Sequence, residues 1–183
     1  MTRERSNPLS DLAKFGFEDL SAALRNLDQL VERVGDTARV AVNPLSGSAS
    51  PDRALVFLLR LAELDAKATG KILRNADSAA RLCAVVGSSD ALADLLLRRI
   101  ELLEVFSKKT SLPKTFSLSS DDRTQLRRDY RRLLLSIVDW DLSQGFRESY
   151  AQVSVALSDL ATSALSAGLT LARRELLAEG RIT

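Results

Sequence analysis

The densest group of side chains that could bind a ligand is a basic cluster. Five arginines fall within ten residues, at Arg123, Arg127, Arg128, Arg131 and Arg132. Guanidinium groups bind phosphate oxygens, so such a stripe could grip a nucleotide or a nucleic acid. Because Asp–Arg pairs at helical spacing satisfy one another, we favour a solvated or salt-bridged face, with phosphate binding as the alternative. The same predicted helix carries as many acidic residues, namely Asp121, Asp122, Asp129, Asp139 and Asp141.

The Asp139-Trp140-Asp141 sequence resembles the Asp-x-Asp pair that holds magnesium in nucleotidyltransferases. In those sites the pair lies on a strand, where residues two apart face the same side. Here it falls in a helical pattern, which points the two carboxylates about 200° apart. No Gly-Ser turn precedes it to cradle a triphosphate. We therefore expect no metal site here and interpret Trp140 as a core anchor.

Few residues of the chain could support any other catalytic chemistry. The chain has no histidine, which excludes Ser-His-Asp triads and histidine-ligated metals. Its single cysteine, Cys83, lies in an apolar run and is interpreted as a buried hydrophobe rather than a nucleophile. No P-loop, dinucleotide fingerprint, zinc spacing or nucleophile elbow occurs. We accordingly predict no catalytic, cofactor-binding or metal-binding residue in this chain.

Small residues recur one turn apart near the end of the chain, at Ala161, Ala164 and Gly168. They would permit the close approach of a partner helix. They would equally permit close packing against a neighbouring helix of the same chain, which is the interpretation we favour.

The composition is that of a soluble globular protein. Of 183 residues, 45% are hydrophobic and 27% charged, and the net charge of +2 offers no global field to attract nucleic acid or a membrane. Met1–Ser10 is charged and polar, so no cleavable signal is visible, and the longest apolar runs, such as Ala54–Leu59, are too short to span a bilayer. We expect a cytoplasmic location.

Two long helical patterns fill the last third of the chain, separated by a short break at Ser143-Gln144-Gly145. The short connection predicts that the two helices fold back antiparallel. If the apolar seam of residues 146–176 stays open, we expect self-association or poor solubility. The apolar positions of the first helix are Leu126, Tyr130, Leu133, Ile137 and Trp140. Those of the second helix are Phe146, Tyr150, Val153, Leu157, Leu160, Ala164, Gly168 and Leu171.

The rest of the chain also indicates helices and no strand, so the predicted fold class is all-α. We predict an N-terminal helical subdomain over residues 1–118 and a long helical pair over 119–183. Upstream we expect helices over Phe17–Val34, from Ser50-Pro51-Asp52 to near Thr69-Gly70, over Ser78–Val86, and over Ala91–Phe106 as one or two pieces. We expect loops at Asn43–Ala49 and 107–118. A helix stop and a new cap are expected at Gly87–Asp90, and another cap at Ser119–Asp122.

Three ordered segments resemble the bifunctional glutamine synthetase adenylyltransferase/deadenylylase family, particularly its actinobacterial members. Leu9–Asp19 is similar to the family's opening "leucine-alanine-arginine-x-Gly-Phe" stretch. Val86–Leu103 is similar to its "GxSxxLxDxLxRxPELL" helix pair. Leu126–Ile137 with Asp141-Leu142, followed by Leu157–Leu165, is similar to "LRRxYRRxLLRIxxRDL…LSDLADAAL", the helical pair that leads into the first catalytic core.

The chain departs from the family pattern at two places. Ile100 stands where the family usually has proline, which loosens a helix junction. Asp139-Trp140-Asp141 replaces an arginine-aspartate dipeptide, which changes a charged pairing near the catalytic core.

The resemblance implies a parent protein several times longer, with two nucleotidyltransferase-like halves. One half removes AMP from a tyrosine of glutamine synthetase by phosphorolysis, and the other attaches AMP from ATP using magnesium. Each site is a glycine-serine turn followed by an Asp-x-Asp strand, and this chain ends about where the first such strand should begin. We therefore expect an N-terminal scaffold fragment, inactive alone, whose partners are the remainder of the parent enzyme and glutamine synthetase.

Two other readings stay open. A free-standing helical interaction module would leave a surplus apolar stripe exposed. A nucleic-acid-binding domain would gather its arginines on one surface, away from the aspartates, although the near neutrality of the chain argues against it.

Overall fold

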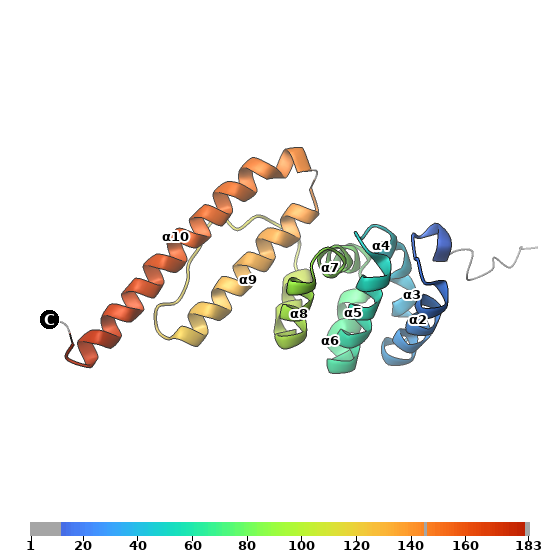
Figure 1. Cartoon of the computed structure of the whole chain (residues 1–183), viewed down its shortest axis with the longest axis horizontal. Coiled ribbons are helices and arrows are strands. Elements are labelled where there is room, and N and C mark those ends of the chain that lie inside the picture. Colours follow the sequence, from blue (N-terminus) through green and yellow to red (C-terminus); the bar gives the residue numbers. More distant parts are fainter. Residues whose placement is uncertain (1–11, 145, 182–183) are drawn as a thin grey trace, which may run out of the picture. The chain divides into compact units, whose positions relative to one another are not determined.

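The computed structural model describes residues 12–144 and 146–181, and these contain helices and no strand (Figure 1). The all-α prediction is confirmed. The chain divides into two compact units, one up to Lys109 and one from Thr110 onward. The expectations for residues 1–11, including the start of the Leu9–Asp19 segment, lie outside the described residues. The functional division at residue 118 stays a prediction.

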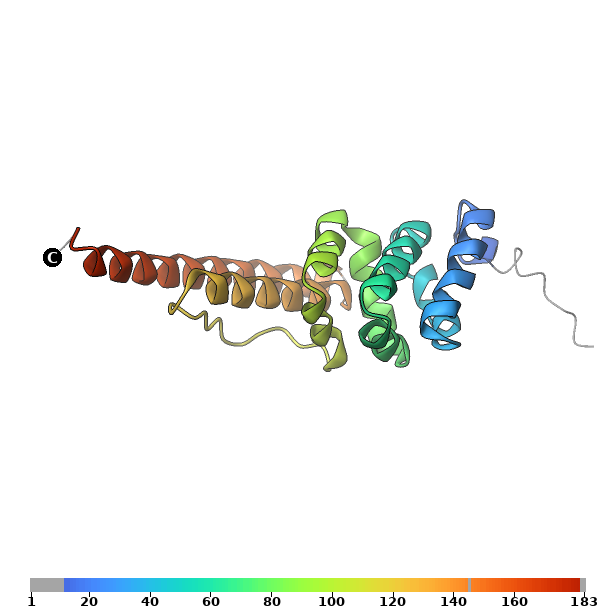
Figure 2. The ribbon, with the colours of Figure 1, turned by 90° about the horizontal axis from the view of Figure 1, so that it is seen from below.

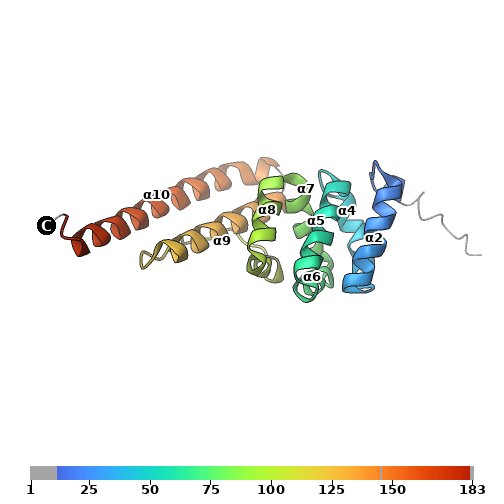
Figure 3. The same cartoon turned by 60° about the horizontal axis from the view of Figure 1, so that its bottom comes forward.

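The first unit is a series of short helices around one central helix, α5 (Figure 3). This helix packs against α2, α4, α6, α7 and α8. Seven of its residues are buried, and at 100° per residue they cover about 200° of the helix, which leaves an exposed side with Val56 and Arg60. In chain order the elements are α2 (Leu20–Val34), α3 (Thr37–Val40), α4 (Val42–Ser46), α5 (Pro51–Leu64), α6 (Ala66–Leu73), α7 (Ala76–Ser88), α8 (Asp90–Arg98) and the 3-10 helix η1 (Ile100–Ser107).

Helix α5 begins where the sequence indicates, but Asp52 rather than a Ser50 side-chain cap makes the hydrogen bonds at its start. Pro51 is the first helical residue and Asp52 lies in the first turn, whereas the Ser50 hydroxyl makes no capping hydrogen bond. The Asp52 carboxylate instead accepts hydrogen bonds from the backbone N–H groups of Glu18 (2.9 Å) and Asp19 (3.3 Å). One side chain thus joins the start of α5 to the start of α2.

Two predicted boundaries are wrong. Asn43–Ala49 is not a loop throughout, because Asn43 to Ser46 lie in α4, where Leu45 is completely buried. Burial of this leucine outweighs the local turn propensity of its neighbours. The helix from Pro51 also does not reach Thr69-Gly70. It ends at Leu64, and Asp65 then caps α6 by accepting from the Ala68 N–H at 2.8 Å.

The predicted helix stop and new cap at Gly87–Asp90 are confirmed, since α7 ends at Ser88, and Gly87 itself has a packing role. It lies inside α7, and the new cap is Ser89, whose hydroxyl accepts from the Leu92 N–H. A Cβ at Gly87 would lie 2.7 Å from the Ser48 Cβ and 3.3 Å from the Ala54 Cβ. Only glycine therefore lets α7 approach the segment after α4 and the start of α5 this closely.

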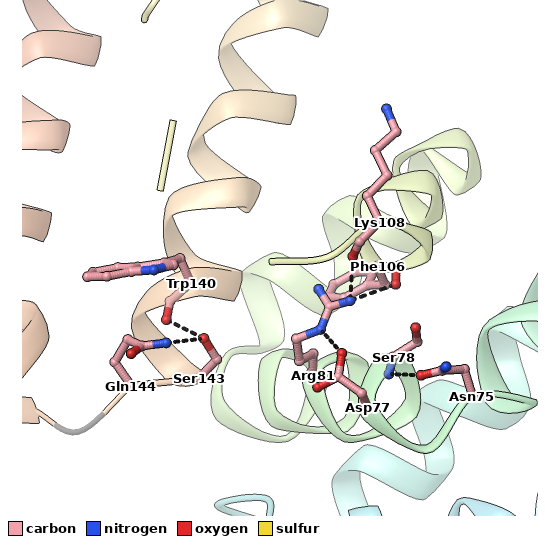
Figure 4. A network of polar contacts seen from close by, with 9 residues as sticks. All are labelled: Asn75, Asp77, Ser78, Arg81, Phe106, Lys108, Trp140, Ser143 and Gln144. Atoms are coloured by element: carbon pink, nitrogen blue, oxygen red, sulfur yellow. Dashed lines mark hydrogen bonds and ion pairs between the residues drawn. The ribbon is translucent and has the colours of Figure 1, made fainter. Parts of the chain in front are cut away.

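A buried arginine ties α7 to the end of η1 (Figure 4). The Arg81 side chain is 5% exposed, and its Nε donates to Asp77 at 3.1 Å. Its Nη2 donates to the carbonyl oxygens of Phe106 (2.8 Å) and Lys108 (2.7 Å). These carbonyls lie at the C-terminal end of η1, where a helix leaves acceptors without intrahelical partners. Arg81 therefore fixes the place at which the first unit ends.

The second unit is an antiparallel pair, α9 (Arg123–Leu142) and α10 (Phe146–Ala178), which confirms the predicted helical pair (Figures 1 and 2). Asp122 caps α9, as expected, by accepting from the N–H groups of Thr124 and Gln125. The two helices share a core of Leu133, Ile137, Ala156 and Leu160, against which Leu112, Phe116, Leu118, Leu134 and Val153 pack.

Polar contacts hold the pair near both of its ends. Arg123 donates through Nε (3.1 Å) and Nη2 (2.5 Å) to the two carboxylate oxygens of Glu175. At the other end the Ser149 hydroxyl donates to Asp141 at 2.6 Å. Contacts between the start of one helix and the end of the other require the antiparallel arrangement.

The predicted apolar stripe on α10 is only partly correct. Leu160 and Leu171 are buried, but Tyr150 is 64% and Leu157 41% exposed, while Ala156 is buried instead. Trp140 is half-buried and is therefore not the enclosed core anchor that we expected. The buried face of α10 is narrower than the set of apolar residues that the sequence supplies.

Replacing Arg81 by methionine should lower the free energy of unfolding of the first unit by about 2–4 kcal/mol, because two buried carbonyls lose a charged donor. Urea denaturation followed by circular dichroism measures this. Arg25→Met, at an exposed position on α2, is the matched control and should change stability by less than about 0.5 kcal/mol. Equal effects of the two substitutions would contradict the role assigned to Arg81.

Two glycine-to-alanine substitutions should change the free energy of unfolding in opposite directions. Gly87→Ala should destabilise the first unit by about 1–2 kcal/mol, since the overpacking outweighs the gain in helix propensity. Gly168→Ala, in α10, places its Cβ where no atom lies within 4 Å and should stabilise the second unit by about 0.5–1 kcal/mol. Urea midpoints compare the two variants, and a shift in the same direction for both would refute this account.

Candidate functional site

Of the two forms that we favoured for the arginine cluster, a solvated or a salt-bridged face, the structure shows few salt bridges, and Arg123, Arg127 and Arg128 are exposed. Of its five members, Arg123 pairs with Glu175. Hydrogen bonding to Arg123 lowers the pKa of Glu175 below its ordinary value, and the same bond raises the pKa of Arg123. Within residues 12–144 and 146–181, the other four (Arg127, Arg128, Arg131 and Arg132) make no ion pair.

The aspartates of α9 have other partners. Asp129 accepts from the Ser119 N–H and from the Gln125 amide, both at 3.0 Å. Asp141 accepts from Ser149, and Asp122 caps the helix. Equal numbers of the two charges therefore do not produce pairing, because the carboxylates are used to fix loops and helix ends.

The Asp139-Trp140-Asp141 sequence does not fit a magnesium pair. It lies within α9, where Asp139 is 3% exposed while Asp141 binds the hydroxyl of Ser149 on α10. Two residues apart on a helix, the carboxylates point in nearly opposite directions. In the part of the chain that the structure describes, no group of three or more His, Cys, Asp or Glu side chains could hold a metal ion.

Cys83 lies in α7 and is fully buried, as expected from its apolar surroundings. Burial raises the pKa of its thiol from 9.0 to about 12, because the thiolate would lose its hydration. A thiol that stays protonated at neutral pH and does not contact solvent is a poor nucleophile.

The most extensive surface feature is an uncharged side of α10, which we call the open face. It carries the exposed side chains of Tyr150 (64%), Leu157 (41%), Leu165 (76%) and Leu169 (57%). At 100° per residue these four fall within an arc of about 120°. Between Ser149 and Ala172 the only charged residue is Asp159.

The small residues Ala161, Ala164 and Gly168 belong to this surface more than to a helix–helix contact. Ala161 is exposed, and the space around Gly168 is empty to 4 Å. Our interpretation that they pack closely against a neighbouring helix is therefore wrong for these two. The signal that could have revealed the open face is a second set of apolar residues on α10, offset from the core set.

The polar side chains around the open face bond within the helix. The hydroxyls of Ser154, Ser158 and Thr162 each donate to the carbonyl oxygen four residues earlier, at 2.9 Å. Their donors are therefore satisfied without water, and covering them costs little hydrogen-bonding energy.

A groove of about 390 Å³ lies beside α10, where the loop before α9 crosses it. Its α10 side includes Val155, which is 60% exposed. Lys114 and Asp159 supply its charges, and its other lining residues are Leu112, Pro113, Phe116, Ala151, Gln152 and Ala156. The groove therefore extends the exposed apolar surface of the second unit.

Among the residues that the structure describes, one helix is long and apolar enough, by length and composition only, to cross a membrane. It is Ser149–Ala178, in which an 18-residue window has a mean hydropathy of 1.4 and is 17% buried. Our expectation from the sequence concerned uninterrupted apolar runs, and α10 reaches this length only because its apolar residues are interspersed with small and hydroxyl-bearing ones. Length and composition alone do not distinguish a membrane span from a helix that protein covers.

Comparison with known proteins gives one consistent relationship. The chain is 33% identical to the bifunctional glutamine synthetase adenylyltransferase/adenylyl-removing enzyme of Leifsonia xyli, over 98% of this chain and 20% of that protein. The enzymes of the same name from Streptomyces avermitilis and Streptomyces coelicolor are 34% and 35% identical, each over 92% of this chain and 18% of the relative.

The chain thus spans about a fifth of the length of the curated relatives that it matches. No family model matches it, and no solved structure matches it. Over nearly its whole length the chain corresponds to one region of these actinobacterial proteins, and it belongs to the family of bifunctional glutamine synthetase adenylyltransferase/adenylyl-removing enzymes.

Proposed function

We propose that this chain is a helical scaffold of an enzyme that adenylylates and deadenylylates glutamine synthetase, and that it is inactive alone. The open face of α10 is the surface on which the remainder of that enzyme docks. The observation that carries the scaffold role is the match of nearly the whole chain to one region of these enzymes. The docking surface is argued from the exposure of Tyr150, Leu157, Leu165 and Leu169 on one uncharged face. Large contiguous apolar patches on soluble proteins mark interaction sites.

The part of the relatives that this chain does not match is the partner that we propose for the open face. About four fifths of each relative has no counterpart in this chain. Covering four large apolar side chains contributes roughly 1.5–3 kcal/mol for each one that becomes fully buried. The hydroxyl groups of the same face are already bonded to the helix, so little opposes their burial.

A protein partner explains the second unit better than a membrane does. Helix α10 packs along α9, which carries Arg127, Arg128, Arg131 and Arg132 on the side away from their shared core. Immersing this pair in hydrocarbon would desolvate those charges at a cost of several kcal/mol each. We therefore keep the expectation of a cytoplasmic protein, with ATP and magnesium held by the remainder of the parent enzyme.

A free-standing interaction module is the second candidate, and it also predicts an exposed apolar stripe. The stripe alone favours neither reading. The match over 92–98% of this chain to a single kind of enzyme favours the scaffold. The scaffold and the free-standing module differ in the protein that would cover α10.

Replacing Leu165 and Leu169 together by glutamate should abolish docking. The Streptomyces coelicolor relative lacking its matching region should co-elute with the wild-type chain in size-exclusion chromatography but not with this variant. Without that partner, the wild-type chain should self-associate through the same face, and the variant should be monomeric by light scattering. The charged side chains would have to be desolvated in either contact.

Leu64→Glu is the matched control, because Leu64 is 59% exposed in the first unit. It should leave both docking and self-association unchanged. A wild-type chain that stays monomeric over a wide concentration range and does not co-elute with the relative would refute the proposal. Partition of the chain into phosphatidylcholine vesicles, lost in the Leu165/Leu169 variant, would assign the open face to a membrane instead.

A further inference from the structure

Four arginines form a second surface in the same unit, which we call the arginine face: Arg127, Arg128, Arg131 and Arg132. At 100° per residue they fall within an arc of about 140° on α9. The core residues Leu133 and Ile137 lie on the opposite side of the helix. Arg127 and Arg128 are exposed, and Arg131 and Arg132 are half-buried.

The arginine face carries four positive charges, and further along the same side of α9 Leu135 and Asp139 are buried. Across the described ranges 12–144 and 146–181 none of the four makes an ion pair, and Asp129 and Asp141 are engaged with Ser119 and Ser149. Arg127 and Arg131 are four residues apart, as are Arg128 and Arg132. Like charges at this spacing destabilise a helix, so the arrangement is unfavourable until an anion neutralises it.

We propose that the arginine face binds an acidic segment of a partner protein. Guanidinium groups bind carboxylates through two parallel hydrogen bonds, and two arginine pairs one turn apart match carboxylates one turn apart on a helix. The face lies on α9 rather than on the open face of α10, so this proposal does not depend on the proposed function.

Helix α9 carries these arginine side chains on a backbone that is ordered before any partner binds. The core of Leu133, Ile137, Ala156 and Leu160 holds its middle, and the Arg123–Glu175 pair holds its start. A preordered helix loses little conformational entropy on binding, which favours recognition of a short segment.

The size and charge of the face favour protein over nucleic acid. Specific DNA-binding proteins commonly neutralise about 6–10 phosphates, whereas four arginines on adjacent turns cover a far shorter length. The net charge of the chain is only +2, so it provides no wider basic surface to follow a polyanion.

The test is binding of a fluorescein-labelled, glutamate-rich helical peptide to the full chain, measured by fluorescence anisotropy at low salt. Substituting Arg127→Gln and Arg131→Gln together should weaken binding about tenfold, and substituting all four arginines should abolish it. The melting temperature should stay unchanged or rise, because like-charge repulsion is removed.

Arg147→Gln combined with Arg173→Gln is the matched control. These exposed arginines lie on α10, and their replacement changes the net charge by the same amount. The control should leave peptide binding within twofold of wild type. No binding of the peptide to the wild-type chain, or an equal loss in both double variants, would overturn the proposal. Tighter binding of a DNA duplex or of anionic vesicles through the same four arginines would also overturn it.

Discussion

The first unit depends on a single desolvated guanidinium. Arg81 lies on α7 among apolar residues, where Asp77 and two carbonyl oxygens at the end of η1 accept hydrogen bonds from its guanidinium group. The same contacts satisfy carbonyls that the short 3-10 helix cannot pair itself. The geometry of α7, the length of η1 and the exit of the chain at Lys108 are therefore coupled through one side chain.

Local sequence signals predict the helices well where a cap and a burial pattern agree. Pro51-Asp52, Ser89 and Asp122 each start a helix where expected. An error falls where tertiary burial competes with turn chemistry, as at Leu45 in α4. Neither the contact of Gly87 with Ser48 nor the bond of Arg81 to Phe106 joins neighbours in sequence, so periodicity carries no sign of them.

The surfaces were less predictable than the helices. Counting charges on α9 suggests internal neutralisation, but the carboxylates of Asp129 and Asp141 point to backbone and hydroxyl donors instead. On α10 the sequence supplies more leucines than one seam can hold, and periodicity alone does not decide which are buried. That decision depends on the position of α9, since Ala156 rather than Leu157 meets the shared core.

The hydroxyl groups along α10 have a consequence for the timing of assembly. Each donates its proton to the helix backbone yet keeps a lone pair that water can reach. The helix is therefore tolerated in two environments, wet while it is alone and dry once it is covered. A charged face would be more soluble but would resist coverage, and a purely aliphatic face would aggregate early. A surface of leucine, alanine and back-bonded serine therefore loses its water at little hydrogen-bonding cost, whether a second copy of the chain or another protein covers it.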